Sequence, residues 1–444
     1  MNLTKLTILT AVLMVIAAAT VLFSASGPFG GSDDDSTAVR DAALENPIDR
    51  QISELQARSA SRPGDAGALT ELGFAYLQKS RENGDPTLYP KAEGVFQQAL
   101  ALSADDPTVI TGLGAVALAR HNFDRALVLA QQAIAIDSAD AASHAVAGDA
   151  LIELGRYDEG VAEFQQAADL RPDLSAFIRI AYARELHGDI EGAREALESA
   201  VEAGGPRGEN AAYARLQLGH LLFGAGDLDE AGTQYENSLE AFPGYSHALA
   251  GLARVHAARG DYGEAIALYE DVTARQPVFE YVAALGDTYA AAGDRAAAER
   301  QYALVGAIDQ LYRANGVNTD LESAIFLADR GDRLDEALAQ AEAIYQAQPR
   351  SVRAADALAW TLHKSGRSAE ALPHARRALR LGSLDNLVLF HTAMIEAEND
   401  NPGGARDLLR QIADANPRFS LRYAGIAAKM LSELDSLAQS EPNR

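Results

Sequence analysis

Histidines are the residues of this 444-residue chain best suited to metal binding or acid–base chemistry, because neutral imidazole is a common metal ligand and titrates near pH 7. No two of the nine form a His-Glu-x-x-His or a short His-x-x-x-His pair. The chain also has no cysteine, which excludes thiolate metal sites, thiol catalysis and disulfides. The sequence therefore predicts no metal site and no cofactor. The histidines are His121, His144, His187, His220, His247, His256, His363, His374 and His391.

Other catalytic motifs are missing as well. The stretch GLGAVA from Gly112 has the look of a fragment of a dinucleotide-binding loop, but no strand precedes it. There is no P-loop and no Gly-x-Ser-x-Gly, and most carboxylates fall at expected helix starts or on solvent faces. We therefore expect a protein that is not an enzyme.

The charge of the chain is strongly acidic. There are 38 Lys and Arg against 63 Asp and Glu, a formal net charge of −25. Nucleic acids and anionic lipid surfaces both require basic contacts, so neither is an expected partner of the folded part. Acidity of this size keeps a large surface soluble, and an acidic groove for a basic partner is the alternative.

The N-terminus carries an export signal. Lys5 precedes an apolar run without charge over residues 6–23, and Asp33 and two further aspartates follow. The run lies between the length of a signal peptide and that of a spanning helix, so residues 1–26 are either a cleaved signal peptide or a membrane anchor, with the anchor favoured. Residues 27–47 are expected to be a flexible linker. The body is then exported to the cell envelope, anchored outside the cytoplasm by residues 6–23 only, or secreted if the signal is cleaved.

In the rest of the chain a glycine recurs every 33 to 38 residues, which is the spacing of a two-helix repeat. His121 and Asp400 hold the same place one unit before and one unit after the series. Such a glycine can adopt positive φ and end the first helix of each pair. The turn glycines are Gly155, Gly188, Gly226, Gly260, Gly293, Gly331 and Gly366.

Each repeat has the same further parts. A small residue such as Gly219 in the first helix lets the second helix approach, and an aromatic such as Tyr235 follows in the second helix. Asp227 and Asp261 follow turn glycines and are expected to cap the second helices, with glutamate three residues later. Prolines then end second helices, because proline cannot continue a helix. These are Pro172, Pro243, Pro277, Pro349 and Pro417.

This pattern resembles the tetratricopeptide repeat (TPR), most clearly in AAYARLQLGHLLFGAGDLDEAGTQYENSLEAFPGY. The resemblance implies an all-α fold, a right-handed superhelix or α-solenoid of about ten helix-turn-helix repeats over residues 66–420. Residues 48–65 would form an N-terminal half-repeat cap, 421–437 a C-terminal capping helix and 438–444 a disordered tail. The ten units are expected to start near Ala66, Pro107, Ala141, Leu174, Ala212, Ser246, Phe279, Val317, Val352 and Asn386.

The resemblance also implies a non-catalytic scaffold that binds a peptide or protein partner in the concave groove formed by first helices. The alternative is a regulatory or small-ligand-binding subunit of an envelope enzyme or transporter complex. Trp, Arg, Met and aromatic residues on first helices are the groove candidates, since such residues dominate binding hot spots. For Trp360 and Phe390, filling joints between repeats is the competing interpretation. The middle set is Arg179, Tyr182, His220, His247 and Arg254, and the C-terminal set is Arg353, Trp360, His363, Lys364, Phe390, His391 and Met394.

Overall fold

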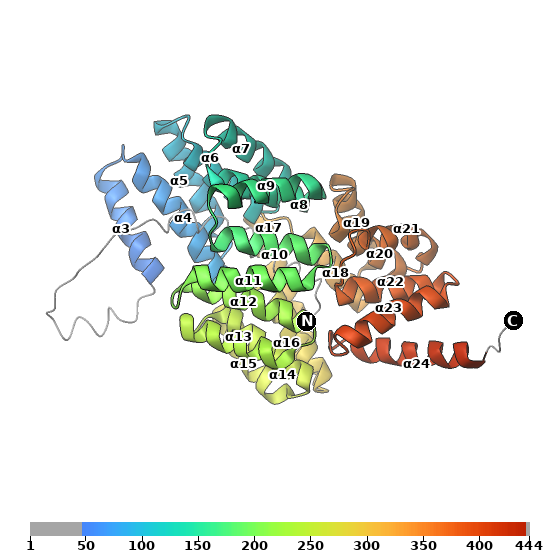
Figure 1. The fold of residues 1–444 in the computed structure, drawn as a ribbon. Helices are drawn as coiled ribbons and strands as arrows, with labels where there is room; N and C mark the ends of the chain where they lie inside the picture. Colours follow the sequence, from blue (N-terminus) through green and yellow to red (C-terminus); the bar gives the residue numbers. More distant parts are fainter. Residues whose placement is uncertain (1–46, 441–444) are drawn as a thin grey trace.

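The computed structural model describes residues 47–440, which form 22 helices and no strand. The predicted signal or anchor and nearly all of the predicted linker lie outside the described residues. Among residues 47–440 no helix combines the length and apolarity needed to cross a membrane. The chain is an α-solenoid of antiparallel helix pairs (Figure 1), as the repeat pattern predicts.

The helices alternate between first and second members of each pair. The first helices are α4 (Ala66–Asn83), α6 (Pro107–Ala119), α8 (Ala141–Glu153), α10 (Leu174–Leu186), α12 (Glu209–Gly224), α14 (Ser246–Arg259), α16 (Phe279–Ala291), α18 (Asp320–Arg330), α20 (Val352–Lys364) and α22 (Asn386–Glu398). The second helices are α5 (Leu88–Leu102), α7 (Phe123–Ile136), α9 (Tyr157–Leu170), α11 (Ile190–Gly204), α13 (Leu228–Ala241), α15 (Tyr262–Arg275), α17 (Arg295–Ala314), α19 (Leu334–Ala347), α21 (Ser368–Ala378) and α23 (Pro402–Ala415). Helix α3 (Pro47–Ser61) precedes the pairs and α24 (Ala424–Ser440) follows them.

Most helix ends lie where the sequence predicts them. Eight of the ten first helices begin at the predicted residue, whereas α12 begins at Glu209 and α18 at Asp320, each three residues away. The five second helices α9, α13, α15, α19 and α23 each end two residues before a predicted proline. Helix α17 has 20 residues against 14 in α13, which delays the next first helix.

The turns inside the pairs have the predicted left-handed backbone. All seven predicted turn glycines have positive φ, for example 75° at Gly155. His121 and Asp400 replace glycine in their units and adopt φ of 58° and 57°. An L-residue with a side chain rarely takes this conformation. The turn is therefore imposed by the repeat geometry rather than by glycine alone.

One capping prediction holds and one is wrong. The Asp227 side chain accepts a hydrogen bond from the backbone N–H of Glu230 at 3.2 Å and caps α13. Asp261 stands at the corresponding position of α15 but forms no side-chain cap. Its carboxylate lies instead 3.6 Å from Nδ1 of His256 on the preceding helix. That distance is too long for a hydrogen bond, so the imidazole does not take over the role of the cap.

Aromatic side chains of second helices fit into notches formed by glycines of first helices. The buried ring of Tyr235 lies between Gly219 of its own pair and Gly251 of the next, and a Cβ at either glycine would stand 2.6 Å from the ring. The Phe96 ring occupies the same kind of notch between Gly73 and Gly112. Real Cβ atoms do not approach so closely, so only glycine fits there. Each such ring joins two consecutive pairs.

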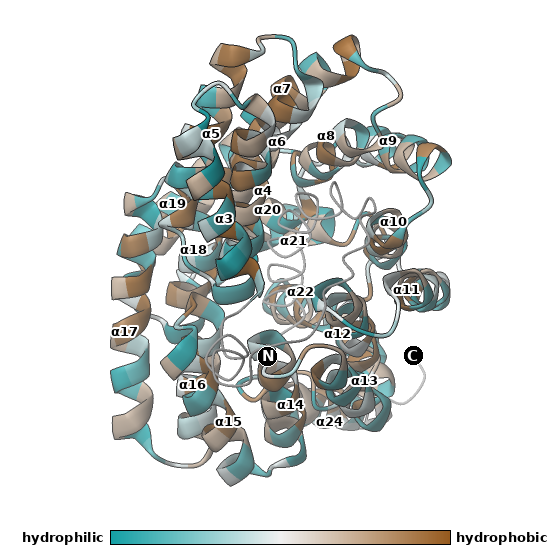
Figure 2. Cartoon of the chain, turned by 90° about the vertical axis from the view of Figure 1, so that its left-hand side faces the viewer, coloured by the Kyte–Doolittle hydropathy of each residue, from teal (hydrophilic) through white to brown (hydrophobic). Residues whose placement is uncertain are grey.

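The stack of pairs curves into a coil that closes on itself. Figure 2 looks at the molecule from the left side of Figure 1 and shows the first pairs following one another round a ring. Helices α19 to α23 then lie beside α8 to α13 (Figure 1). Contacts between residues about 195 apart connect the two turns, for example the hydrogen bond from the Val352 backbone N–H to the Tyr157 hydroxyl, at 2.9 Å. We call this line of turn-to-turn contacts the seam.

Turns inside the early pairs meet loops between the later pairs along the seam. At one contact, Asn318 N–H donates to the Arg120 carbonyl at 3.1 Å, and Nδ1 of His121 lies 2.6 Å from the Asn318 carbonyl oxygen. Farther along, Asn416 Nδ2 donates to the Phe223 carbonyl at 2.7 Å. Equivalent close approaches join Gly84 to Val278, Gly155 to Arg350, Gly188 to Gly382 and Gly226 to Ala415.

Candidate partner-binding site

All five predicted residues of the middle set lie on first helices, but their side chains are buried. Arg179 and Tyr182 come from α10, His220 from α12, and His247 and Arg254 from α14, with 1 to 5% of each residue exposed. The expectation of an open groove lined by exposed side chains is therefore corrected here. Direct contact of these residues with a partner stays a prediction.

The physical reason for the burial is that these side chains have partners within the chain. Arg179 forms a two-pronged ion pair with Asp149 of α8, with N–O distances of 2.9 and 2.8 Å. Burial of this pair raises the pKa of Asp149 to about 6, against the stabilising charge of Arg179. The guanidinium of Arg254 lies 3.5 Å from the centroid of the Phe223 ring. Because the Arg179 guanidinium is already paired with Asp149, it has no free pair of N–H groups for a carboxylate ligand.

Further buried polar residues, which the sequence analysis did not predict, lie beside the middle set. Arg81, at the end of α4, forms a buried ion pair with Glu209 at the start of α12, and Tyr245 donates a hydrogen bond to the same carboxylate at 3.1 Å. The Arg81 carbonyl lies 2.9 Å from Nε2 of His247. No repeat period connects Arg81 to Glu209, which is 128 residues away, so no sequence signal pointed to this pair.

Helix α12 carries three polar side-chain atoms that are shut off from water and have no hydrogen-bond partner among residues 47–440. They are the Tyr213 hydroxyl, Nε2 of Gln217 and Nε2 of His220, each on a residue no more than 3% exposed. Spacings of four and three residues place them in one row on a helix. We call this row the α12 polar row. A buried polar atom without a partner costs about 1–3 kcal/mol, which a ligand with matching groups could recover.

The other side of His220 is already occupied. Its Nδ1 lies 2.8 Å from the Tyr235 hydroxyl. Burial, together with the nearby Arg254 and His247, keeps the pKa of His220 well below its usual value, so the ring is neutral at pH 7. A neutral imidazole has one donor and one acceptor nitrogen. The row therefore offers hydrogen bonds rather than charge.

The C-terminal set splits into buried and accessible members. Trp360, Phe390 and His391 are 0 to 2% exposed. This burial agrees with the interpretation that Trp360 and Phe390 fill joints between repeats. The Trp360 ring stacks on His391 at a centroid distance of 4.0 Å, and its Nε1 donates to Asp329 at 2.8 Å. These three residues therefore pack against one another inside the fold and are not an exposed binding hot spot.

The remaining members are partly exposed. Arg353 reaches across the seam to Glu153 at 2.8 Å. His363 lies 2.9 Å from the Ser368 hydroxyl, and the ammonium group of Lys364 lies 5.4 Å from the centroid of the Trp360 ring. Met394 packs against the apolar cluster around Phe390. Of the whole predicted set, these are the side chains that a partner could touch without any rearrangement.

Family comparisons agree with the geometry. Family models described as the tetratricopeptide repeat match residues 145–208, 222–286 and 357–418. The helix pairs α10–α11, α14–α15 and α22–α23 lie inside these matches. Residues 145–208, 222–286 and 357–418 therefore carry tetratricopeptide repeats.

Several curated proteins align with the chain. It is 27% identical over 151 residues to anaphase-promoting complex subunit 7 of Arabidopsis thaliana, covering 34% of this chain and 26% of that protein. It is 39% identical over 87 residues to tetratricopeptide repeat protein 36 of Mus musculus, covering 19% and 47%. It is 28% identical over 314 residues to cellulose synthase operon protein C of Xanthomonas axonopodis pv. citri, covering 69% and 17%. The chain thus spans less than half of each of these relatives.

A search of solved structures also finds helical relatives. The human IFIT1 dimer with PPP-AAAA superposes with a TM-score of 0.46 at 13% identity, over 91% of this chain and 94% of that one.

Within residues 47–440 no group of three or more His, Asp or Glu side chains is arranged to hold a metal ion.

Proposed function

We propose that this protein is a non-catalytic scaffold that binds a peptide or protein partner on the concave side of its first turn. The observation that carries the proposal is the α12 polar row. The Tyr213 hydroxyl, Nε2 of Gln217 and Nε2 of His220 lack partners within the described residues and are shut off from water, so a peptide pairs with them only after the helices around α12 move apart. A repeat array that occupies most of the chain, without a catalytic motif, supports the same assignment.

Export and tethering are part of the proposal. The uncharged apolar run over residues 6–23, with Lys5 before it and aspartates after it, supports an anchor with the repeats outside the cytoplasm. Membrane fractionation of the full chain and of a chain lacking residues 6–23 tests this part. Recovery of both chains in the same soluble fraction would contradict it.

Binding at the α12 polar row is tested by substitutions that keep shape and remove hydrogen bonding. We expect Gln217→Met, combined with Tyr213→Phe, to abolish the partner cross-links that the full-length wild-type chain forms in intact cells, as mapped by mass spectrometry to the inner helices. Gln166→Met is the matched control, because Gln166 is exposed on α9. Cross-links to the inner helices that survive the double substitution would overturn the assignment of the row.

A regulatory or small-ligand-binding subunit of an envelope enzyme or transporter complex remains a second candidate, because a pocket with a largely apolar wall lies at the seam.

A further inference from the structure

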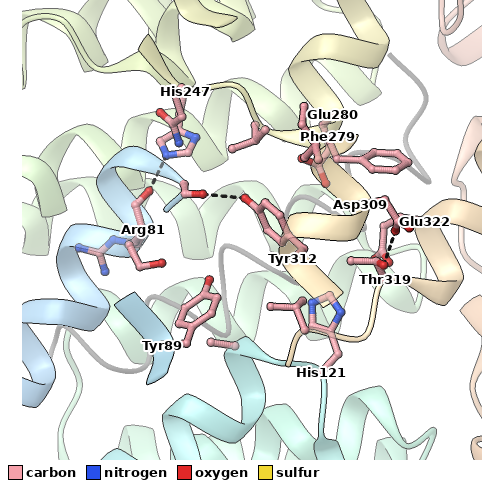
Figure 3. Close-up of a pocket in the computed structure, with 17 residues that line it drawn as sticks. Arg81, Tyr89, His121, His247, Phe279, Glu280, Asp309, Tyr312, Thr319 and Glu322 are labelled. Atoms are coloured by element: carbon pink, nitrogen blue, oxygen red, sulfur yellow. Dashed lines mark hydrogen bonds between the residues drawn. The ribbon is translucent and has the colours of Figure 1, made fainter. Parts of the chain in front are cut away.

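A pocket lies at the seam where the coil completes its first turn. The space between its walls is about 700 Å³, a figure that includes open solvent at its mouth. Its walls come from the end of α4, the start of α5, the turn after α6, and helices α14, α16, α17 and α18. Figure 3 shows Tyr312 standing between the Arg81 side and the Glu322 side of this pocket. We call it the seam pocket.

Most of the seam-pocket wall is apolar or aromatic. Ala119, Val278, Ile308 and Val317 contribute aliphatic surface, and Tyr89, Phe279 and Tyr312 contribute rings. The Tyr312 hydroxyl is held by donating a hydrogen bond to the Gly84 carbonyl at 2.8 Å, which fixes the ring in the pocket. A ligand for this wall needs an apolar body, and ring faces also attract cations.

The charged groups of the seam pocket are mostly carboxylates. Glu280, Asp309 and Glu322 line it, against the single arginine Arg81. Arg81 is already paired with Glu209, and Asp309 with Arg313 and Thr319. His247 adds no positive charge at pH 7, because burial lowers its pKa to about 4. The pocket therefore has a negative balance.

Glu322 is the carboxylate that points to a ligand. The residue is 8% exposed, and its Oε2 is shut off from water and has no hydrogen-bond partner within residues 47–440. Glu322 interacts electrostatically with Arg353, but the Arg353 guanidinium is itself paired with Glu153 at 2.8 Å. A buried carboxylate without a hydrogen-bonded partner is costly, and a cation bound beside it would remove that cost.

We propose that the seam pocket binds an organic cation with an apolar body, an amine or guanidinium group on an alkyl or aryl chain, with the positive charge placed at Glu322. A free amine and a Lys or Arg side chain of a peptide share this chemistry. Because the walls belong to both turns of the coil, binding also stabilises the seam. This site is separate from the α12 polar row and does not depend on it.

Titration calorimetry and thermal unfolding of the full chain with 4-phenylbutylamine test the proposal, with 4-phenylbutanol as the neutral analogue. We expect saturable binding of the amine, a raised unfolding temperature, and binding of the alcohol that is about tenfold weaker or more. Glu322→Gln should weaken amine binding by the same factor. Glu240→Gln, at an exposed carboxylate on α13, should leave it unchanged.

The two sources of the cation are then separated by competition with the peptide acetyl-Ala-Ala-Lys-Ala-Ala-amide. Displacement of the amine by the peptide supports a side chain as the natural occupant, and failure to displace it supports a free amine. Equal binding of amine and alcohol, or a Glu322→Gln chain that is folded by circular dichroism and binds the amine like wild type, would overturn the proposal.

Discussion

The joints between neighbouring pairs and the seam between turns are held together by different chemistry. At a joint, an aromatic ring fills a notch made by glycines, as Tyr235 does between Gly219 and Gly251. At the seam, backbone carbonyls accept hydrogen bonds from side chains such as Asn386 and Asn416, at 3.0 and 2.7 Å. At these positions apolar packing joins neighbouring pairs, and hydrogen bonds to backbone carbonyls join the two turns. Removing one kind of contact should leave the other in place, which makes the comparison testable.

The largest effect is expected at a joint. Tyr235→Ala leaves a cavity where a fully buried ring joined two pairs, and it orphans Nδ1 of His220. We expect a loss of about 3–5 kcal/mol in the free energy of unfolding. Urea unfolding followed by circular dichroism measures it. Leu304→Ala on the exposed side of α17 is the control and should cost little. Equal losses in the two variants would mean that the notches do not hold the stack.

A carboxylate at the seam gives the next effect. Burial, with a contribution from Asp385 on the other turn, raises the pKa of Glu185 to about 7. The folded chain then binds a proton that the unfolded chain, with an ordinary glutamate pKa, releases near pH 4.5. Stability from this group is complete below that pH and is lost as pH rises to about 7.

Glu185→Gln removes this titration. We expect the variant to be more stable than wild type at pH 8, by about 3 kcal/mol at most, and the two chains to converge near pH 4. Urea midpoints across this range measure the difference. The exposed Glu240→Gln is the control. A difference that does not change with pH would contradict the raised pKa of Glu185.

A glycine at the seam separates the two kinds of contact directly. Gly155 and Gly293 have φ of 75° and 91°, so alanine strains the backbone at both. Only Gly155 abuts the backbone of Arg350 on the other turn, whereas nothing lies within 4 Å of a Cβ at Gly293. We expect Gly155→Ala to lose about 1–3 kcal/mol more than Gly293→Ala.

The same pair of variants reports on shape. Gly155→Ala should increase the radius of gyration in small-angle X-ray scattering while the helical circular dichroism signal stays constant, because the turns separate and the joints remain. An unchanged radius for a Gly155→Ala chain that has lost stability would mean that the seam yields locally without opening.

The same contrast explains what could be predicted from the sequence. Glycine and aromatic residues such as Gly219 and Tyr235 recur at the repeat spacing, so their packing roles can be predicted from the sequence alone. The partners His121 and Asn318 are 197 residues apart, and no sequence motif links them. Their meeting depends on the rotation accumulated over the intervening pairs, which includes the lengthened helix α17. Groove candidates such as Arg179 were placed correctly on first helices, but their burial depends on partners that periodicity does not reveal.

The smallest effect separates notch glycines from glycines without a packing role. Gly306 lies within α17, and a Cβ there would meet nothing within 4 Å. Gly286 of α16 faces the Tyr302 ring, which a Cβ would approach to 2.5 Å. Alanine favours a helix over glycine by about 0.5–1 kcal/mol, so Gly306→Ala should raise the free energy of unfolding by that amount and shift the urea midpoint upward. Gly286→Ala gains the same propensity but must displace the ring, and it should lower the midpoint. If both substitutions shifted the midpoint in the same direction, helix propensity rather than notch packing would explain where glycine is placed in this solenoid.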